Sequence, residues 1–131
     1  MERLHERLQS AKRALDTLRE IVSIDEPSTI ERDAGIQRFE YSFEACWKAA
    51  KQYLYDVEGL DIGSPKGVMR AFREVGIFSE DETILGLHMV NDRNLTVHTY
   101  NEELAIEIFS KLPHYHQLLS NWMDRLNNDN T

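Results

Sequence analysis

Apolar residues recur every three or four positions along most of this chain, and that spacing leaves little choice of fold class. The first stretch shows it most clearly, with intervals of four and three between Leu4, Leu8, Ala11, Leu15, Leu18 and Val22. This is the period of an α-helix with one apolar face. The helix should stop before Pro27, because proline does not fit a helix interior. No segment keeps the period of two that a strand requires, so we expect an all-α fold.

A second helix is predicted from about Thr29 to Glu58, ending at Gly59. Its apolar face comprises Ile36, Phe39, Phe43, Trp47, Ala50, Leu54 and Val57. Aromatic residues at helical spacing indicate a packed core more often than a ligand site. On the opposite face, Glu44 and Lys48 have the spacing of an i,i+4 ion pair.

Capping residues and one further proline divide the rest of the chain. A short helix is predicted between Ser64, a good N-cap, and Gly76. Ser79, followed three residues later by a glutamate, forms the capping box of a fourth helix. The expected inward face of that helix comprises Ile84, Leu87, Val90 or Asn91, and Leu95. The last helix should run from about Asn101 to Leu126, bent or split at Pro113. These segments predict one domain over residues 1–131, an antiparallel four-helix up-and-down bundle with an additional short helix.

Composition narrows the classes of function. The formal charge of −8 works against broad nonspecific binding of nucleic acid, which needs clustered lysine and arginine. No apolar run approaches the roughly 20 residues of a membrane span, and the charged N-terminus is unlike a signal peptide. We therefore expect a cytoplasmic protein that makes no contact with a membrane. The single cysteine, Cys46, cannot form an internal disulfide and is expected to be a buried structural thiol.

The segment NDRNLTVHTYNE, residues 91–102, holds the candidate site residues. On one continuous helix Asn94 and His98 would share a face, and Arg93 and Tyr100 another, whereas Arg93 and His98 would diverge by about 140°. Two copies related by a two-fold axis could still bring both pairs into one groove. Arginine can hold a phosphate with a bidentate fork, and histidine can exchange a proton near neutral pH. Such a groove could support cleavage of RNA without a metal.

A plainer interpretation of the same segment is a polar helix end. Thr99 or Asn101 would cap the last helix, and Glu102 and Glu103 would favour its positive end. The remaining histidines do not predict a metal site. His114 and His116, two residues apart, point about 200° apart on a helix. We therefore expect neither a metal nor a cofactor.

Two segments together resemble the HEPN superfamily: RDAGIQRFEYSFEACWK, residues 32–48, and DRNLTVHTYNEE, residues 92–103. The resemblance is closest to the branch paired with minimal nucleotidyltransferases, several members of which were described as nucleotidyltransferase substrate-binding proteins. Its signature is arginine, four to six residues, then His-x-Tyr. Arg93, His98 and Tyr100 match it, and Asn94 supplies the polar residue often found after the arginine. The intervening SPKGVMRAFREVGIF also fits, so the resemblance extends from about Arg32 to Pro113.

The resemblance implies a homodimeric, metal-independent ribonuclease toxin in which Arg93 and His98 meet across the dimer. It also implies a nucleotidyltransferase partner that acts as antitoxin by transferring AMP from ATP to Tyr100. Arg32 and Arg38 could add charge to the RNA groove or form ion pairs within the bundle, and we favour the ion pairs.

Two other functions remain open. In the first, the chain is a noncatalytic subunit that binds a substrate or nucleotide for a separate nucleotidyltransferase, with Arg93 holding phosphate. In the second it is a purely structural helical dimer. The chain is not expected to be the nucleotidyltransferase itself, because no Gly-Ser dipeptide is accompanied by paired aspartates.

Overall fold

The computed structural model describes residues 1–129, and every regular element in that range is helical. The elements are α1 (Glu2–Val22), α2 (Thr29–Glu58), α3 (Pro65–Glu74), α4 (Glu80–Leu95), the 3₁₀ turn η1 (Thr96–His98) and α5 (Glu102–Asp129). The predicted all-α bundle is confirmed. None of these helices is both long and apolar enough to cross a bilayer.

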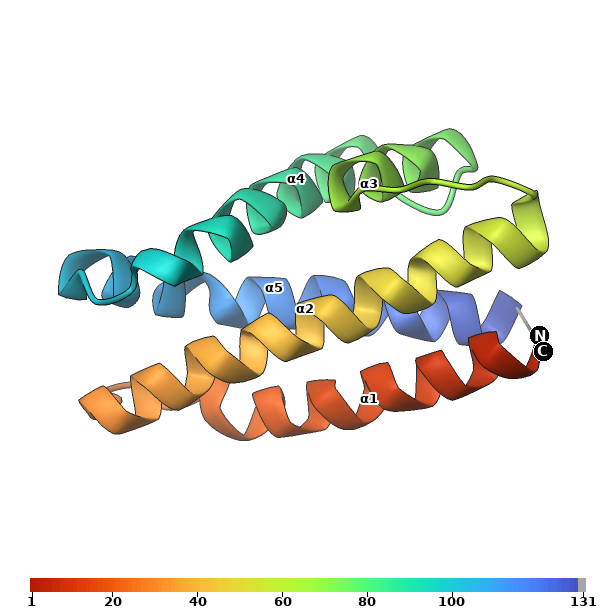
Figure 1. Ribbon diagram of the computed structural model, residues 1–131. Coiled ribbons are helices and arrows are strands. Elements are labelled where there is room, and N and C mark those ends of the chain that lie inside the picture. Colours follow the sequence, from red (N-terminus) through yellow and green to blue (C-terminus); the bar gives the residue numbers. More distant parts are fainter. Residues whose placement is uncertain (130–131) are drawn as a thin grey trace.

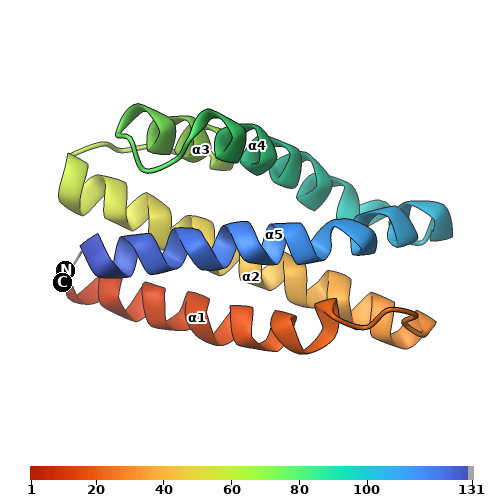
Figure 2. The same ribbon diagram turned by 180° about the vertical axis from the view of Figure 1, so that it is seen from behind.

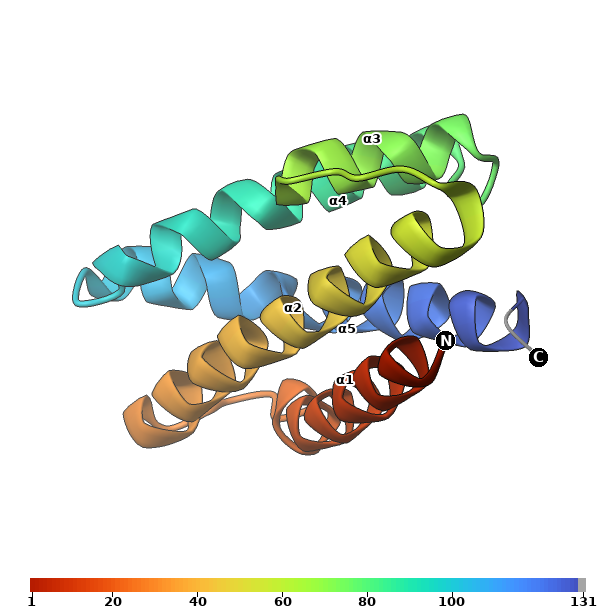
Figure 3. The same ribbon diagram turned by 45° about the vertical axis from the view of Figure 1, so that its right-hand side comes forward.

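The four long helices alternate in direction along the bundle (Figure 1). α1 and α2 pack closely against each other, and α5 lies against both of them (Figure 2). The short α3 pairs with α4, and together they lie over α2 on the side away from α1 (Figure 3). The α1–α2 connection and the α4–α5 connection therefore lie at the same end of the molecule (Figure 1).

Local capping signals fix the helix boundaries. Ser79 and Glu82 form the predicted capping box at the start of α4, and Ser28 forms a second one with Glu31 at the start of α2. α2 ends at Gly59, whose φ of 69° lies in the left-handed region that glycine adopts without strain. Sequence and structure agree wherever a boundary depends on a few neighbouring residues.

The core is filled by large side chains from α2, α3 and α5. Those with almost no exposed surface include Phe39, Phe43, Tyr53, Phe72, Tyr115 and Trp122. Cys46 is buried and free, as expected. Of the face predicted for α2, Trp47 is only half-buried and Val57 is 40% exposed. In α1, Ile21 is buried while Val22 is half-buried.

The face predicted for α4 was only partly right. Val90 is buried as predicted and Leu87 is half-buried, but Ile84 and Leu95 are 48% and 41% exposed, and the buried side of the helix also carries Gly86 and Met89. The cause is α3, which packs onto α4 with Met69 against the helix backbone: a Cβ added to Gly86 would lie 3.0 Å from the Met69 sulfur. The close approach of the two helices turns α4 away from the face that its own apolar residues suggest.

α5 is not split at Pro113. The proline lies on the exposed side of the helix, where water can take the place of the hydrogen bond that its ring removes. α5 therefore runs the length of the bundle as one helix.

Candidate functional site

The α-helix does not continue through the candidate segment. It ends at Leu95, tightens into η1, and turns at residues 99–101 before α5 begins. The backbone N–H of Thr99 donates to the Thr96 carbonyl, and that of Asn101 donates to the His98 carbonyl. The angles calculated for one continuous helix therefore do not apply to His98 and Tyr100.

The turn places His98 and Tyr100 side by side on the surface. The Tyr100 hydroxyl lies 3.5 Å from Nδ1 of His98, a long hydrogen-bonding contact, and the two rings meet edge to face with centroids 6.0 Å apart. Tyr100 is 86% exposed, so its hydroxyl is open to a partner molecule. Asn94 is exposed as well.

Arg93 points instead toward α2. Its Nη1 lies 3.4 Å from Glu40 Oε2, and its Nη2 lies 3.7 Å from Glu44 Oε1. Nη1 also donates to the Thr96 hydroxyl at 3.1 Å. That hydroxyl lies 2.9 Å from Glu40 and 2.7 Å from the Arg93 carbonyl, and it can donate to only one of them at a time. The Arg93 side chain is 23% exposed, and its Nε is buried without a hydrogen-bond partner.

The two carboxylates determine what Arg93 can do. One guanidinium against two carboxylates carries a net charge of −1, so a phosphate must compete with Glu40 and Glu44 for the arginine. Glu44 also accepts a hydrogen bond from Trp47 Nε1 at 3.1 Å and faces α4, not its predicted partner Lys48. Among the described residues no hydrogen bond joins Arg93 to His98, so a single chain does not assemble them into one catalytic pair.

Asp92, the residue before Arg93, is a buried carboxylate that the sequence did not single out. It is 8% exposed and accepts a hydrogen bond from the Tyr115 hydroxyl and another, at 3.3 Å, from Lys111. Burial, followed by this bond to Asp92, raises the pKa of Tyr115 well above its usual range. Asp92 therefore fastens the last turn of α4 to α5 and fixes the position from which Arg93 extends. No motif in the sequence marks it, because its partners Lys111 and Tyr115 lie 19 and 23 residues further along the chain.

The arginines near the start of α2 form the ion pairs we favoured. Arg38 donates to the Thr17 carbonyl at 2.7 Å and to Glu20 at 3.1 Å. Arg32 lies 3.7 Å from Glu102. Within residues 1–129, neither arginine makes an ion pair or hydrogen bond with the Arg93 cluster, which consists of Arg93, Glu40, Glu44 and Thr96.

Histidine, cysteine and carboxylate groups do not converge on a metal-binding geometry in residues 1–129. His116, on α5, donates from Nε2 to the Leu15 carbonyl at 3.1 Å, and burial lowers its pKa. That histidine therefore ties α5 to α1.

Comparison with known proteins identifies the family. Residues 6–128 match the model of the family described as nucleotidyltransferase substrate binding protein like. This chain belongs to that family. The match includes the whole of α2, α3, α4 and η1 and most of α1 and α5.

Solved structures share the fold of this family member. A crystal structure of a protein from Thermus thermophilus is 55% identical, with a TM-score of 0.87, and the alignment covers 88% of this chain and 98% of that one. A second structure, from Haemophilus influenzae, is described as revealing the fold of a substrate binding domain of a nucleotidyltransferase. It is 20% identical with a TM-score of 0.65, covering 96% of this chain and 98% of that one, and it supports the fold alone. A search of proteins with curated functions gave no match.

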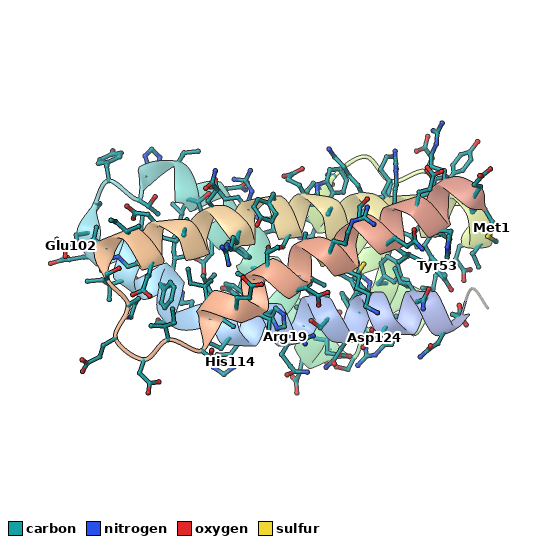
Figure 4. All side chains as sticks on the ribbon, turned by 90° about the horizontal axis from the view of Figure 1, so that it is seen from below. Met1, Arg19, Tyr53, Glu102, His114 and Asp124 are labelled. Carbon is teal, nitrogen blue, oxygen red and sulfur yellow. The ribbon has the colours of Figure 1, made fainter. Side chains whose placement is uncertain are left out.

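The surface cavities of this protein lie away from the Arg93 cluster. One cavity of about 300 Å³ lies between α1 and α5 and includes Arg19 and Asp124 in its lining (Figure 4). Others, of about 410 Å³ and 340 Å³, lie between α3 and α4 and beside the α1–α2 connection. Arg93, His98 and Tyr100 line none of the three. His98 and Tyr100 are exposed and so offer an open surface, which suits a macromolecular partner better than an enclosed small ligand.

Proposed function

We propose that this protein is the noncatalytic, substrate-binding subunit of a two-component nucleotidyltransferase, and that the end of α4 together with η1 faces the catalytic partner. The observation that carries the proposal is the family match over residues 6–128. The open surface around Tyr100, which is 86% exposed, supports a role in binding a partner.

Tyr100 is the group we propose to receive a nucleotide. Its exposed hydroxyl oxygen would attack the α-phosphorus of an ATP held by the partner. An oxygen–phosphorus bond forms, the bond from the α-phosphorus to the bridging oxygen of the β-phosphate breaks, and pyrophosphate leaves. The phenol proton needs an acceptor, and His98 Nδ1 at 3.5 Å is placed to take it.

The test combines the purified chain with a small nucleotidyltransferase from the same organism and ATP, followed by intact-mass and peptide mass spectrometry. We expect one adenylyl group on the wild type and none on Tyr100→Phe. Tyr41→Phe is the matched control, because Tyr41 is 42% exposed and lies on α2, outside η1. Equal labelling of wild type and Tyr100→Phe would refute the assignment of the acceptor.

Nucleotide binding by the mixed complex tests the role of Arg93. We expect Arg93→Ala to weaken it, because a cationic partner of the phosphate is lost. The double variant Glu40→Gln, Glu44→Gln should strengthen it, since the amides no longer compete with phosphate for the guanidinium. Unchanged affinity in both variants would remove Arg93 from the binding surface.

A HEPN-type ribonuclease toxin, acting as a homodimer, is the second candidate. Leu95 and Val97, 41% and 67% exposed, lie beside the His98–Tyr100 pair and offer apolar surface for a two-fold contact. A second copy is needed because one chain does not join Arg93 to His98. In the dimer an RNA 2′-hydroxyl would attack the adjacent phosphorus, the 5′-oxygen would leave, and His98 would move the proton. AMP on Tyr100 would add negative charge where the RNA phosphate must bind, and so would act as the off-switch.

RNA cleavage in EDTA separates the two candidates. Cleavage by the unmodified wild type that is lost in His98→Ala and in the Tyr100-modified protein would establish the ribonuclease. His114→Ala is the matched control, because that histidine is exposed on α5 away from η1. Sedimentation should then show a dimer. No cleavage by the wild type, with Tyr100 confirmed as unmodified, would leave the binding subunit as the function.

A further inference from the structure

A second polar feature lies at the same end of the bundle and takes no part in the proposed function. The cavity of about 340 Å³ beside the α1–α2 connection is walled largely by apolar residues, among them Val22, Ile24, Ile106 and Phe109. Its volume falls in the range of small-molecule sites in proteins. Arg32, from the first turns of α2, lines the same cavity and places a permanent positive charge in it.

Arg32 is poorly satisfied within the bundle. Its side chain is only 11% exposed, and its Nε is buried without a partner. Its one ion pair in residues 1–129 is a 3.7 Å contact with Glu102, which is itself 74% exposed. Figure 4 shows the Glu102 side chain pointing away from the end of the bundle. Arg38, two turns further along α2, instead makes two direct hydrogen bonds.

The shortage of acceptors around Arg32 points to a missing ligand, because burial of a guanidinium is unfavourable unless its donors find acceptors. Arginine offers five N–H groups in a planar fork, and no hydrogen bond to the Arg32 side chain occurs within the described residues. A ligand carboxylate in the cavity would supply acceptors that Arg32 lacks within the protein. The planar guanidinium can donate two parallel hydrogen bonds to the two carboxylate oxygens.

Gly35, one turn after Arg32, gives the cavity a fixed wall. A Cβ added to Gly35 would lie 2.7 Å from Phe109 Cε2 and 3.4 Å from Ile21 Cγ2. The missing side chain therefore lets the Phe109 ring lie directly against α2, beside the arginine. A ring held this way is an apolar surface that does not need to rearrange before a ligand binds.

We propose that this cavity binds a small apolar monocarboxylate. Its carboxylate pairs with Arg32 in place of the loose contact with Glu102, and its apolar body packs on Ile24, Ile106 and Phe109. Asp25 also lines the cavity, and its negative charge disfavours phosphate and other dianions more than a single carboxylate. The site shares no residue with the Arg93 cluster, so its occupancy is independent of the proposed function.

The test uses the full chain labelled on its isoleucine methyl groups, titrated with phenylacetate and followed by NMR. Phenylacetamide, nearly the same in shape and uncharged, and inorganic phosphate are titrated in parallel. We expect saturable shifts at the Ile24 and Ile106 methyls with phenylacetate, and binding weaker by about tenfold or more with the amide. Phosphate should not reach the same affinity.

Three variants make the result specific. Arg32→Gln should weaken phenylacetate binding by about tenfold or more, since a charge-assisted pair is lost. Arg38→Gln, on the same helix and paired with Glu20, should leave the affinity unchanged. Glu102→Gln changes only a solvent-exposed side chain and should tighten binding, because it removes the competing carboxylate.

Any one of four results would overturn the proposal. These are the absence of saturable shifts in the wild type, binding of the amide or of phosphate as tight as that of phenylacetate, unchanged phenylacetate binding in Arg32→Gln, and Glu102→Gln binding no tighter than wild type. The last of these decides the matter if Arg32→Gln fails to fold.

Discussion

Replacing Asp92 by alanine should destabilise the protein through one buried hydroxyl group. Asp92 is 8% exposed and accepts hydrogen bonds from Tyr115 and Lys111. Tyr115 is only 1% exposed, so without Asp92 its hydroxyl is left buried with no acceptor. A buried polar group without a hydrogen-bond partner costs about 1–3 kcal/mol. Lys111 is 40% exposed and keeps Glu107 at 3.5 Å, so the loss of its contact with Asp92 adds little. We therefore expect Asp92→Ala to lower the free energy of unfolding by about 1–3 kcal/mol.

Urea unfolding followed by helical circular dichroism measures this change, with an unchanged slope as evidence that the unfolded state is the same. Asp92→Asn is the matched control, because its side-chain carbonyl still accepts from Tyr115. The double variant Asp92→Ala, Tyr115→Phe should recover part of the loss, since it removes the stranded hydroxyl; contacting pairs typically couple by about 0.5–3 kcal/mol. The reasoning would be refuted by an Asp92→Ala protein whose free energy of unfolding is within about 0.5 kcal/mol of the wild-type value. It would also be refuted if the losses of Asp92→Ala and Tyr115→Phe, each measured alone, simply add in the double variant.

Three further predictions use the same unfolding assay. Gly35→Ala should lower stability by about 1–3 kcal/mol, because its Cβ would lie 2.7 Å from the ring of Phe109, which is only 7% exposed; a neutral effect would show that the ring retreats. Stability should fall as the pH rises above about 9, because burial raises the pKa of three groups and the unfolded chain therefore loses their protons at a lower pH than the folded one. Each group lowers the free energy of unfolding by up to about 1.4 kcal/mol per pH unit. These groups are Cys46, Tyr53 and Tyr115. A profile that stays flat to about pH 11 would contradict it. On the acid side, the hydrogen bond from Arg125 is the main cause that lowers the pKa of Glu82. The contribution of Glu82 to stability should therefore be lost as the pH falls from about 4.5 through the folded pKa of this carboxyl group. Glu82→Gln should remove that part of the acid dependence, and an unchanged loss of stability at low pH would show that other carboxylates cause it.

The sequence was sufficient for features that depend on a few neighbouring residues. The helical period of α1, the capping box of Ser79 and the stop at Gly59 each follow from local backbone chemistry, and all three are present. The burial of Cys46 follows from its place among apolar helical positions. The segment holding Arg93, His98 and Tyr100 was also found from sequence, although its functional role remains a proposal.

Features that depend on a distant partner were not accessible in the same way. The buried face of α4 is set by the contact of Met69 with Gly86, which no local pattern records. The sequence placed Glu44 on the polar face of α2, and only the fold brings Arg93 against Glu44 and Glu40. The burial of Asp92 depends on Tyr115, which lies 23 residues further along the chain.

The sequence by itself therefore determined that this chain forms helices, where most of them begin and end, and which segment holds the unusual polar residues, because each of these depends on interactions within about one helical turn. Only the tertiary structure decided which side of α4 is buried, that Arg93 is held by two carboxylates from another helix, and that Arg32 is left with too few acceptors beside an apolar cavity. Those outcomes depend on how helices far apart in the chain pack against one another. Only that packing determines how deeply a charged side chain is buried and which partners it finds.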